Sequence, residues 1–265
     1  MTGTNFENIT LTTSDGVATI RLNRPDAANG MTLAMMQDLL QATTACDGDP
    51  SIRAVVLTGN GKMFCAGGDL NSFAALGDKV RDGLSEMATM LHAAVSRLAR
   101  MEKPVIVAVN GMAAGGGLSL AMIGDIVLGA ASSKYTMAYT GAGLTPDGSS
   151  TYFLPRLIGL RRTQELMLTN RRLSAEEALD WGLLTRIVPD DDLMTEADAI
   201  ARTLANGPTR AFGKVKHLLT ETFDNGLEKQ MELEGRTIAA QAASPDGQEG
   251  INAFLEKRAP NFTGI

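Results

Sequence analysis

The chain has 265 residues, of which 44% are hydrophobic and 20% are charged, close to the average for soluble globular proteins. That length allows one large domain, or one domain with a helical appendage, and excludes a string of small modules. The 24 Lys and Arg against 30 Asp and Glu give a formal net charge of −6, and basic residues never run longer than a pair. This balance argues against nucleic acid and anionic membranes as main partners.

The few cysteines and histidines limit the possible covalent and metal chemistry. Cys46 and Cys65 are too few for a disulfide framework, and His92 and His217 add too few ligands for a Cys/His metal site. Two free thiols suit a reducing compartment, so we expect a cytoplasmic protein. The sequence shows no charged-then-apolar leader and no stretch near eighteen apolar residues, so we expect no targeting segment and no membrane span.

The first two thirds of the chain alternate between strand and helix patterns. Residues 9–22 alternate apolar and polar side chains around Asp15-Gly16, a pair that favours a tight turn, which predicts an antiparallel hairpin. Buried strands are predicted at residues 53–58, 104–109 and 125–128, helices at 31–45, 80–101 and 118–123, and a glycine-rich loop at 111–117. Strands alternating with helices predict stacked βαβ units and an α/β core.

Beyond Pro155 the strand signals fade and helical patterns follow one another. They cover residues 161–168, 174–181, 193–205, 209–223, 227–243 and 245–258. Ser174 and Glu177 have the spacing of a capping box, which supports the start of the second of these helices. We therefore expect a core over residues 1–192 and a helical region over residues 193–265.

Two glycine-bearing turns are the places where chemistry is expected. Residues 64–70 follow the first core strand and residues 110–117 follow the second, each where a strand gives way to a helix. Such a turn leaves backbone N–H groups without helical partners, and two of them together can hold an oxyanion. Each could also be an ordinary tight turn. Neither fits the phosphate-loop or dinucleotide-binding patterns.

Five motifs, in this order and spacing, resemble the enoyl-CoA hydratase/isomerase family, also called the crotonase family. They are Asn23-Arg24-Pro25, Phe64-Cys65-Ala66-Gly67-Gly68-Asp69-Leu70, the run from Asn110 to the glycine triplet at Gly117, Pro146 with its following loop, and Phe254-Leu255-Glu256-Lys257-Arg258. The resemblance runs from about residue 9 to residue 262. It implies an α/β, crotonase-like spiral of ββα units with a C-terminal helical trimerisation region. It also implies a homotrimer or a dimer of trimers.

The resemblance implies an acyl-CoA thioester as substrate, with its carbonyl oxygen bound by the N–H groups of Gly68 and Gly116. Charge that develops on this oxygen in an enolate must be met by fixed donors. No metal and no redox cofactor is then required, since coenzyme A is part of the substrate. The site implied by the resemblance also includes substrate-contacting residues at Arg24, Ala66, Asp69, Leu70, Tyr139, Phe254 and Lys257.

The proton carrier implied by the resemblance is Asp147. Family members that hydrate a double bond have two glutamates, and this chain has Ser119 and Tyr139 at those positions. Neither is an ionised base at neutral pH, which argues against an ordinary hydratase. Members that shift double bonds or isomerise ring-epoxidised aromatic acyl-CoAs have an aspartate in the loop at 143–148. An aspartate before glycine is also common turn chemistry. We expect substitutions of Ser119 and Tyr139 to act weakly, through packing.

The sequence most resembles the 2-(1,2-epoxy-1,2-dihydrophenyl)acetyl-CoA isomerases of phenylacetate breakdown within that family. A Δ3,Δ2-enoyl-CoA isomerase would use the same residues, so that alternative stays open. Further alternatives are an enoyl-CoA hydratase with a single carboxylate, and a non-catalytic acyl-CoA-binding or RNA-binding relative. The acidic balance argues against RNA.

The remaining conspicuous residues are expected either to bind CoA at the entrance of the site or to have structural roles. Arg24 and Lys257 are the cations near the motifs, and either could meet the phosphates of CoA or be a solvated surface charge. His92 and His217 have no motif partner, so we expect structural or solvated roles for both. Cys65 has no clear base beside it and is not expected to act as a nucleophile.

Overall fold

The computed structural model describes residues 6–265. The larger of its two sheets has six strands. Its order is β1-β2-β3-β5-β7-β10, with β1 antiparallel to β2 and the other neighbours parallel. The bounds are β1 Ile9–Ser14, β2 Val17–Leu22, β3 Ala54–Gly59, β5 Val105–Val109, β7 Ile126–Ala130 and β10 Arg186–Val188. Asp15 and Gly16 both have positive φ, as a tight hairpin turn requires, and the predicted hairpin is confirmed.

A second, four-stranded sheet has the order β4-β6-β8-β9 and was not predicted. Its strands are β4 Met63–Cys65, β6 Met112–Ala114, β8 Lys134–Thr136 and β9 Leu173–Ser174. Each of β3, β5 and β7 is followed by one of these short strands and then by a helix, so the chain advances in repeated ββα turns. This arrangement confirms the crotonase-like spiral, and it places a strand inside the loop predicted at 111–117.

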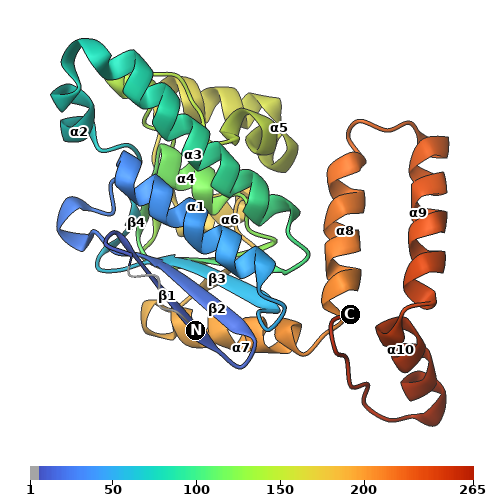
Figure 1. Cartoon of the computed structure of the whole chain (residues 1–265). Coiled ribbons are helices and arrows are strands. Elements are labelled where there is room, and N and C mark those ends of the chain that lie inside the picture. The colour runs from blue at the N-terminus through green and yellow to red at the C-terminus, as the bar shows by residue number, and fades with distance from the viewer. Residues whose placement is uncertain (1–5) are drawn as a thin grey trace.

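Helices cover both faces of the larger sheet, as Figure 1 shows. On one face lie α1 (Leu33–Gly48) and α3 (Val80–Arg100), and on the other lies α7 (Leu193–Ala205). Strand β3 serves both layers, because Val55 and Leu57 join the core under α1 and α3, while Ala54 and Val56 join the core under α7.

Helix α7 therefore belongs to the core, and the expected division at residue 193 is too early in the chain. Leu193, Ala197, Ala201 and Ala205 form a buried stripe against the sheet. Its small side chains let the helix lie close to β3 and β5. The helices that project from the core begin with α8, which still contacts α3 and is joined to the core by the ion pair of Lys216 with Asp125.

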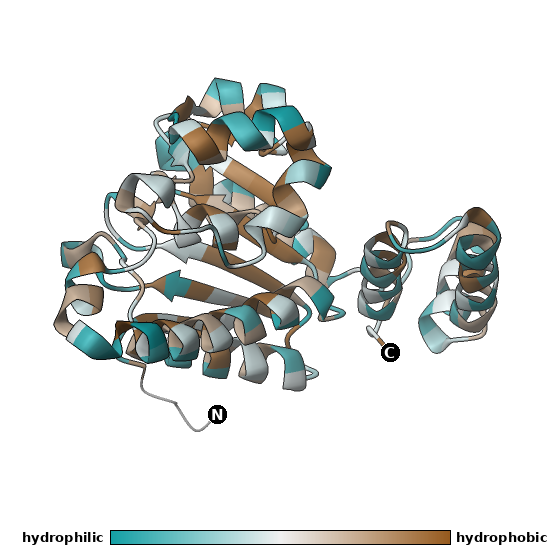
Figure 2. Ribbon diagram, turned by 90° about the horizontal axis from the view of Figure 1, so that it is seen from above, coloured by the Kyte–Doolittle hydropathy of each residue, from teal (hydrophilic) through white to brown (hydrophobic). Residues whose placement is uncertain are grey.

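The C-terminal helices α8 (Thr209–Glu221), α9 (Leu227–Ala242) and α10 (Pro245–Glu256) form a separate arm (Figures 1 and 2). The guanidinium of Arg53 fastens the arm to the core through Thr209 Oγ1, the carbonyl of Gly207 and the carbonyl of Phe262. Large apolar side chains remain exposed on the arm, namely Val215, Leu219, Leu227, Met231, Ile238, Ile251, Phe254 and Leu255. Exposed apolar surface of this extent marks an interaction surface.

The other helices are α2 (Leu70–Ala75), α4 (Gly116–Ala121), α5 (Ser150–Thr169) and α6 (Ala175–Trp181). The predicted capping box of Ser174 and Glu177 is confirmed at the start of α6. Helix α5 begins at Ser150, well before the predicted residue 161, and it is interrupted at Gly159, whose φ of 77° is not helical. No helix in residues 6–265 is long and apolar enough to cross a membrane.

Candidate active site

The two glycine turns lie side by side where β4 and β6 end. A side chain added at Gly67 would place its Cβ 2.8 Å from the carbonyl of Ala114 and 3.2 Å from the nitrogen of Gly116. Gly67 also has a φ of 91°, which L side chains rarely adopt. Glycine is thus required here by both conformation and space, and its absence of a side chain brings the turns into contact.

The backbone N–H groups of Gly68 and Gly116 have no hydrogen-bond partner among the described residues. Gly68 is bridged to Met31 through its neighbours, since Met31 N donates to Gly67 O and Asp69 N donates to Met31 O. Gly116 is the first residue of α4, where a helix has no internal acceptor for its N–H. Both residues line one cavity of about 370 Å³, which we call the glycine-turn cavity.

A loop at residues 24–31 holds the first turn in place through Asn29, a residue that the sequence did not single out. The fully buried Asn29 donates from Nδ2 to the carbonyls of Asn60, Met63 and Phe64, and its Oδ1 accepts from Arg24 N. These bonds satisfy the amide and tie the loop to the strand that leads into the turn.

Arg24 supports the same loop. Its guanidinium forms a 3.0 Å ion pair with Asp69 and donates to the carbonyl of Gly30, with 23% of the side chain exposed. Arg24 is therefore not a free solvated charge, and its guanidinium is already occupied on the side that faces the turn.

Asp69, which was expected to contact the substrate, caps helix α2 and does not line the glycine-turn cavity. Its carboxylate accepts from the N–H groups of Asn71 and Ser72. Burial raises the pKa of Asp69, but the bonds from Ser72 and Asn71 and the ion pair with Arg24 outweigh it, so the net pKa lies below the ordinary value. Asp69 thus stays ionised as a structural anion.

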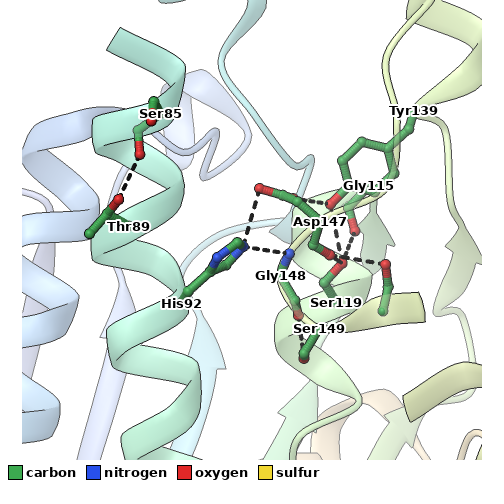
Figure 3. Close-up of polar contacts among 10 residues, drawn as sticks. Ser85, Thr89, His92, Gly115, Ser119, Tyr139, Asp147, Gly148 and Ser149 are labelled. Atoms are coloured by element: carbon green, nitrogen blue, oxygen red, sulfur yellow. Dashed lines mark hydrogen bonds and ion pairs between the residues drawn. The ribbon is translucent and has the colours of Figure 1, made fainter. Parts of the chain in front are cut away.

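Asp147 lines the glycine-turn cavity and is contacted by Tyr139 and Ser119, the residues at the positions where the resemblance implied glutamates (Figure 3). Tyr139 donates to Asp147 Oδ1 at 2.7 Å, and Ser119 Oγ donates to the backbone carbonyl of Asp147 at 2.9 Å. The two hydroxyl oxygens are also 3.1 Å apart. Ser119 and Tyr139 thus contact Asp147 through hydrogen bonds that the sequence did not predict.

Tyr139 remains a hydrogen-bond donor at any working pH. Burial, followed by the negative charge of Asp147, raises the pKa of Tyr139 above its ordinary value. Because the phenol stays protonated, Oδ1 of Asp147 is permanently occupied by a donor. Oδ2 accepts no hydrogen bond from any described residue and lies nearest to His92.

His92 on α3 is the second residue that the sequence analysis left aside. Its Nε2 accepts from the N–H of Gly148 at 3.2 Å and lies 3.8 Å from Asp147 Oδ2 (Figure 3). This contact with the loop was not predicted, but an acceptor that holds Gly148 is consistent with the structural role expected for His92. The sequence could not reveal this contact, because α3 and the loop at 143–149 are far apart in the chain and meet only in the folded structure. His217 lies on α8, away from this cavity.

The rest of the cavity wall is mainly apolar. Met31, Leu84, Met87 and Leu91 contribute side chains, and the ring of Phe73 lies against Gly68, where an added Cβ would be 2.4 Å from it. Asp147 is the only carboxylate that lines this cavity in the described part of the chain. An apolar wall with a few converging polar groups is typical of a site for a small organic ligand.

The structure brings together most, but not all, of the predicted site residues. Ala66, Gly68, Leu70, Gly116, Tyr139 and Asp147 all line the glycine-turn cavity. Phe254 and Lys257 lie on or just after α10, in the arm, and do not line it in this chain. Arg81, an exposed residue near the start of α3 that was not predicted, is the cation that does.

Neither thiol nor metal chemistry is supported by the residues around this cavity. Cys65 is fully buried, donates to the carbonyl of Asn29, and has its pKa raised to about 12 by burial. A thiolate does not form there near neutral pH, which agrees with the expectation that Cys65 is no nucleophile. Among residues 6–265 no three His, Cys, Asp or Glu side chains are grouped to hold a metal ion.

Comparison with known proteins gives one family over nearly the whole chain. The enoyl-CoA hydratase/isomerase family model matches residues 12–264. The 1,2-epoxyphenylacetyl-CoA isomerase of Escherichia coli is 41% identical over 94% of this chain and 95% of its own. A 4-chlorobenzoyl coenzyme A dehalogenase of Arthrobacter is 34% identical over 97% and 94%.

The solved structures agree with the sequence comparison. The crystal structure of an enoyl-CoA hydratase from Polaromonas superposes with a TM-score of 0.92 at 32% identity, covering 96% of this chain and 99% of that one. The chain therefore belongs to the enoyl-CoA hydratase/isomerase family.

Proposed function

We propose that the protein is an acyl-CoA isomerase in which Asp147 moves a proton between carbons of a thioester enolate held by Gly68 and Gly116. The observation that carries this proposal is the composition of the cavity. Two unpartnered N–H groups share it with a single carboxylate, and the two hydroxyls at the glutamate positions are engaged in holding that carboxylate.

The backbone N–H groups of Gly68 and Gly116, which we call the oxyanion half of the site, account for enolate formation. Removing a proton beside a thioester carbonyl leaves negative charge on the carbonyl oxygen, and donors fixed in advance stabilise that charge without reorganisation. Losing one such donor typically costs about 2.7–4 kcal/mol of transition-state stabilisation. Gly68 and Gly116 supply these donors from the backbone, so no side chain has to be ordered when the substrate binds.

Asp147 supplies the proton transfer. Its free Oδ2 takes a proton from one carbon, and the resulting carboxylic acid returns it to another carbon of the enolate, which leaves an isomer and the carboxylate. A positioned acid–base group of this kind adds roughly 10²- to 10⁴-fold to the rate. Addition of water between two carboxylates would need a second carboxylate in the cavity.

The proposed substrates are a ring-epoxidised phenylacetyl-CoA or a 3-enoyl-CoA. The first is supported by the 41% identical relative, which is a 1,2-epoxyphenylacetyl-CoA isomerase. The apolar wall with Phe73 and Leu91 suits an aromatic or hydrocarbon acyl group. We propose Arg81 for the phosphates or the pantetheine arm of CoA, because Arg81 lines the cavity, whereas Arg24 is paired with Asp69.

The test measures turnover of both substrates by the wild type and by Asp147→Asn. The Asn side chain keeps an oxygen for the Tyr139 hydroxyl, so the loop is retained while the base is lost. We expect turnover to fall by at least about 10²-fold with acyl-CoA binding preserved. His217→Gln, which alters a residue outside the cavity, is the matched control. Near wild-type turnover by the Asn variant would contradict the role of Asp147.

A second candidate is hydration of an enoyl-CoA by a single carboxylate. It is favoured by His92, which lies 3.8 Å from Asp147 and could help activate a water molecule. Mass spectrometry separates the two reactions, because an isomer has the mass of its substrate and a hydrated product has gained one water. Binding of acyl-CoA without any turnover would instead favour a non-catalytic binding protein.

We further propose that the chain assembles as a homotrimer or a dimer of trimers through the arm formed by α8–α10. The support is the exposed apolar surface on these helices, including Leu219, Ile238 and Phe254. In such an assembly Phe254 and Lys257 could approach the cavity of a neighbouring copy. Light scattering that returned only the 28.0 kDa monomer at micromolar concentration would refute this assembly.

A further inference from the structure

A second cavity lies behind the glycine-turn cavity, between α3, α5 and α8. It has a volume of about 670 Å³, and we call it the α3–α5–α8 cavity. Its wall carries many polar side chains, including Ser96, Arg100, Asp125, Ser149, Arg156 and Lys216. A cavity of this size with several hydrogen-bonding partners holds water.

The two cavities share a thin wall made of neighbouring residues on two segments. On α3, Leu91 lines the glycine-turn cavity and His92 lines the α3–α5–α8 cavity. On the loop, Asp147 lines the first and Ser149 lines the second. His92 and Asp147 meet across this wall, as Figure 3 shows.

The contacts of Asp147 with Tyr139 and His92 distinguish its two carboxylate oxygens. Tyr139 occupies Asp147 Oδ1, so Oδ2 is both the oxygen available to the substrate and the one nearest to His92 Nε2. Nε2 accepts from Gly148 N–H, so this nitrogen presents its lone pair on the side of the loop. A small rotation of the ring would let the same nitrogen accept a proton from Oδ2 instead.

We propose that His92 exchanges the proton carried by Asp147 with solvent in the α3–α5–α8 cavity. This inference rests on the proposed isomerase function. After Asp147 has taken a proton from the substrate carbon, Oδ2 passes that proton to His92 Nε2, which restores the carboxylate and forms an imidazolium. The imidazolium then releases a proton to water in the second cavity. The reverse steps bring a solvent proton to the enolate.

Exposure of the pair agrees with a route in two stages. The side chain of His92 is 51% exposed, whereas that of Asp147 is 34% exposed and turned toward the substrate cavity. An acyl group bound in the glycine-turn cavity would cover Asp147 and separate its carboxylate from bulk water. His92 would keep its contact with solvent in the α3–α5–α8 cavity, so the proton could leave while the substrate remained bound.

The competing explanation is that His92 only supports the loop through Gly148. His92→Gln separates the two roles, because its side-chain oxygen can still accept from Gly148 N–H but cannot carry a proton at neutral pH. His92→Ala removes both functions, and imidazole added to the buffer can enter the second cavity. Imidazole bound there can both accept from Gly148 N–H and carry a proton, so its effect is compared with that of His92→Gln, which keeps only the support.

The experiment follows deuterium in acyl-CoA incubated with the enzyme in D₂O. One arm uses a 3-enoyl-CoA and measures deuterium per isomerisation event, and the other uses saturated phenylacetyl-CoA, whose acidic C–H can exchange without isomerisation. We expect the wild type and His217→Gln to incorporate deuterium, and His92→Gln to incorporate at least about tenfold less per turnover. Imidazole should raise incorporation by His92→Ala toward the wild-type level.

The two arms distinguish failure of the relay from failure of the proposed function. If the wild type isomerises and His92→Gln incorporates deuterium at the wild-type level, the relay is wrong and the isomerase function stands. If the wild type exchanges the C–H of phenylacetyl-CoA without isomerising anything, the isomerase function is wrong and the variants still decide the relay. Absence of both reactions in the wild type overturns both proposals.

Discussion

Replacing Tyr139 by Phe tests the orientation of Asp147 with the smallest change in shape. The substitution removes one hydroxyl, which donates to Asp147 Oδ1 at 2.7 Å, and keeps the ring that lines the cavity. A hydrogen bond to a charged group contributes about 1.5–3 kcal/mol. If that energy holds the carboxylate in its reactive position, kcat should fall by between roughly 10- and 150-fold. Because 34% of the Asp147 side chain is exposed, water can replace part of the bond, which favours the lower half of this range.

The assay is steady-state isomerisation of a 3-enoyl-CoA, with kcat and KM measured separately. KM should change little, because the hydroxyl is bonded to the protein and not to the CoA portion. Tyr135→Phe is the matched control, since its buried hydroxyl makes a bond of the same 2.7 Å length to Ser133, outside the cavity. A kcat for Tyr139→Phe within twofold of that for Tyr135→Phe would refute the reasoning.

Three further predictions concern the turn, the entrance and the thiols. Gly67→Ala should lower the free energy of unfolding by at least about 1–2 kcal/mol, measured by urea denaturation, because alanine is strained at this φ and its Cβ would approach the carbonyl of Ala114. Arg81→Gln should raise KM for acyl-CoA with little change in kcat, and its KM should depend less on salt; an unchanged KM would place the CoA phosphates elsewhere. Burial raises the pKa of Cys46 and Cys65 to about 12, so both thiols stay protonated as pH rises from 7 to 9. They should react with iodoacetamide only after unfolding, and rapid labelling of the native protein at pH 8 would contradict their burial.

Much of the larger sheet could be predicted from the sequence because its strands are long and carry a local signal. The run at 54–59 is buried throughout, and the hairpin has both alternation and a turn pair with positive φ. The second sheet could not be predicted, because β4, β6 and β8 each have three residues and β9 has two. Strands this short carry no readable period, and they form only because the spiral brings them together.

The site residues also divide into those with a local sequence signal and those without one. Gly68 and Gly116 were predictable, since a glycine turn between strand and helix is a local feature and the family resemblance gave their role. His92 was not, because its contact with Gly148 joins residues 56 positions apart. The ion pair of Arg24 was not predictable for a related reason, since its partner Asp69 is 45 positions away. In both cases the chemistry of the side chain depends on a neighbour that only the folded chain supplies.

The two halves of the site are held by different kinds of contact, and this difference affects how the chemistry can change. The oxyanion half is fixed by backbone bonds, such as Met31 N to Gly67 O and Gly115 N to Thr136 O. The proton-transfer half is fixed largely by side chains, through Tyr139, Ser119 and His92. Side chains can be exchanged without moving the backbone that is proposed to stabilise the enolate. Substitutions around Asp147 should therefore alter which proton moves and whether water takes part, while the binding of the thioester carbonyl is retained.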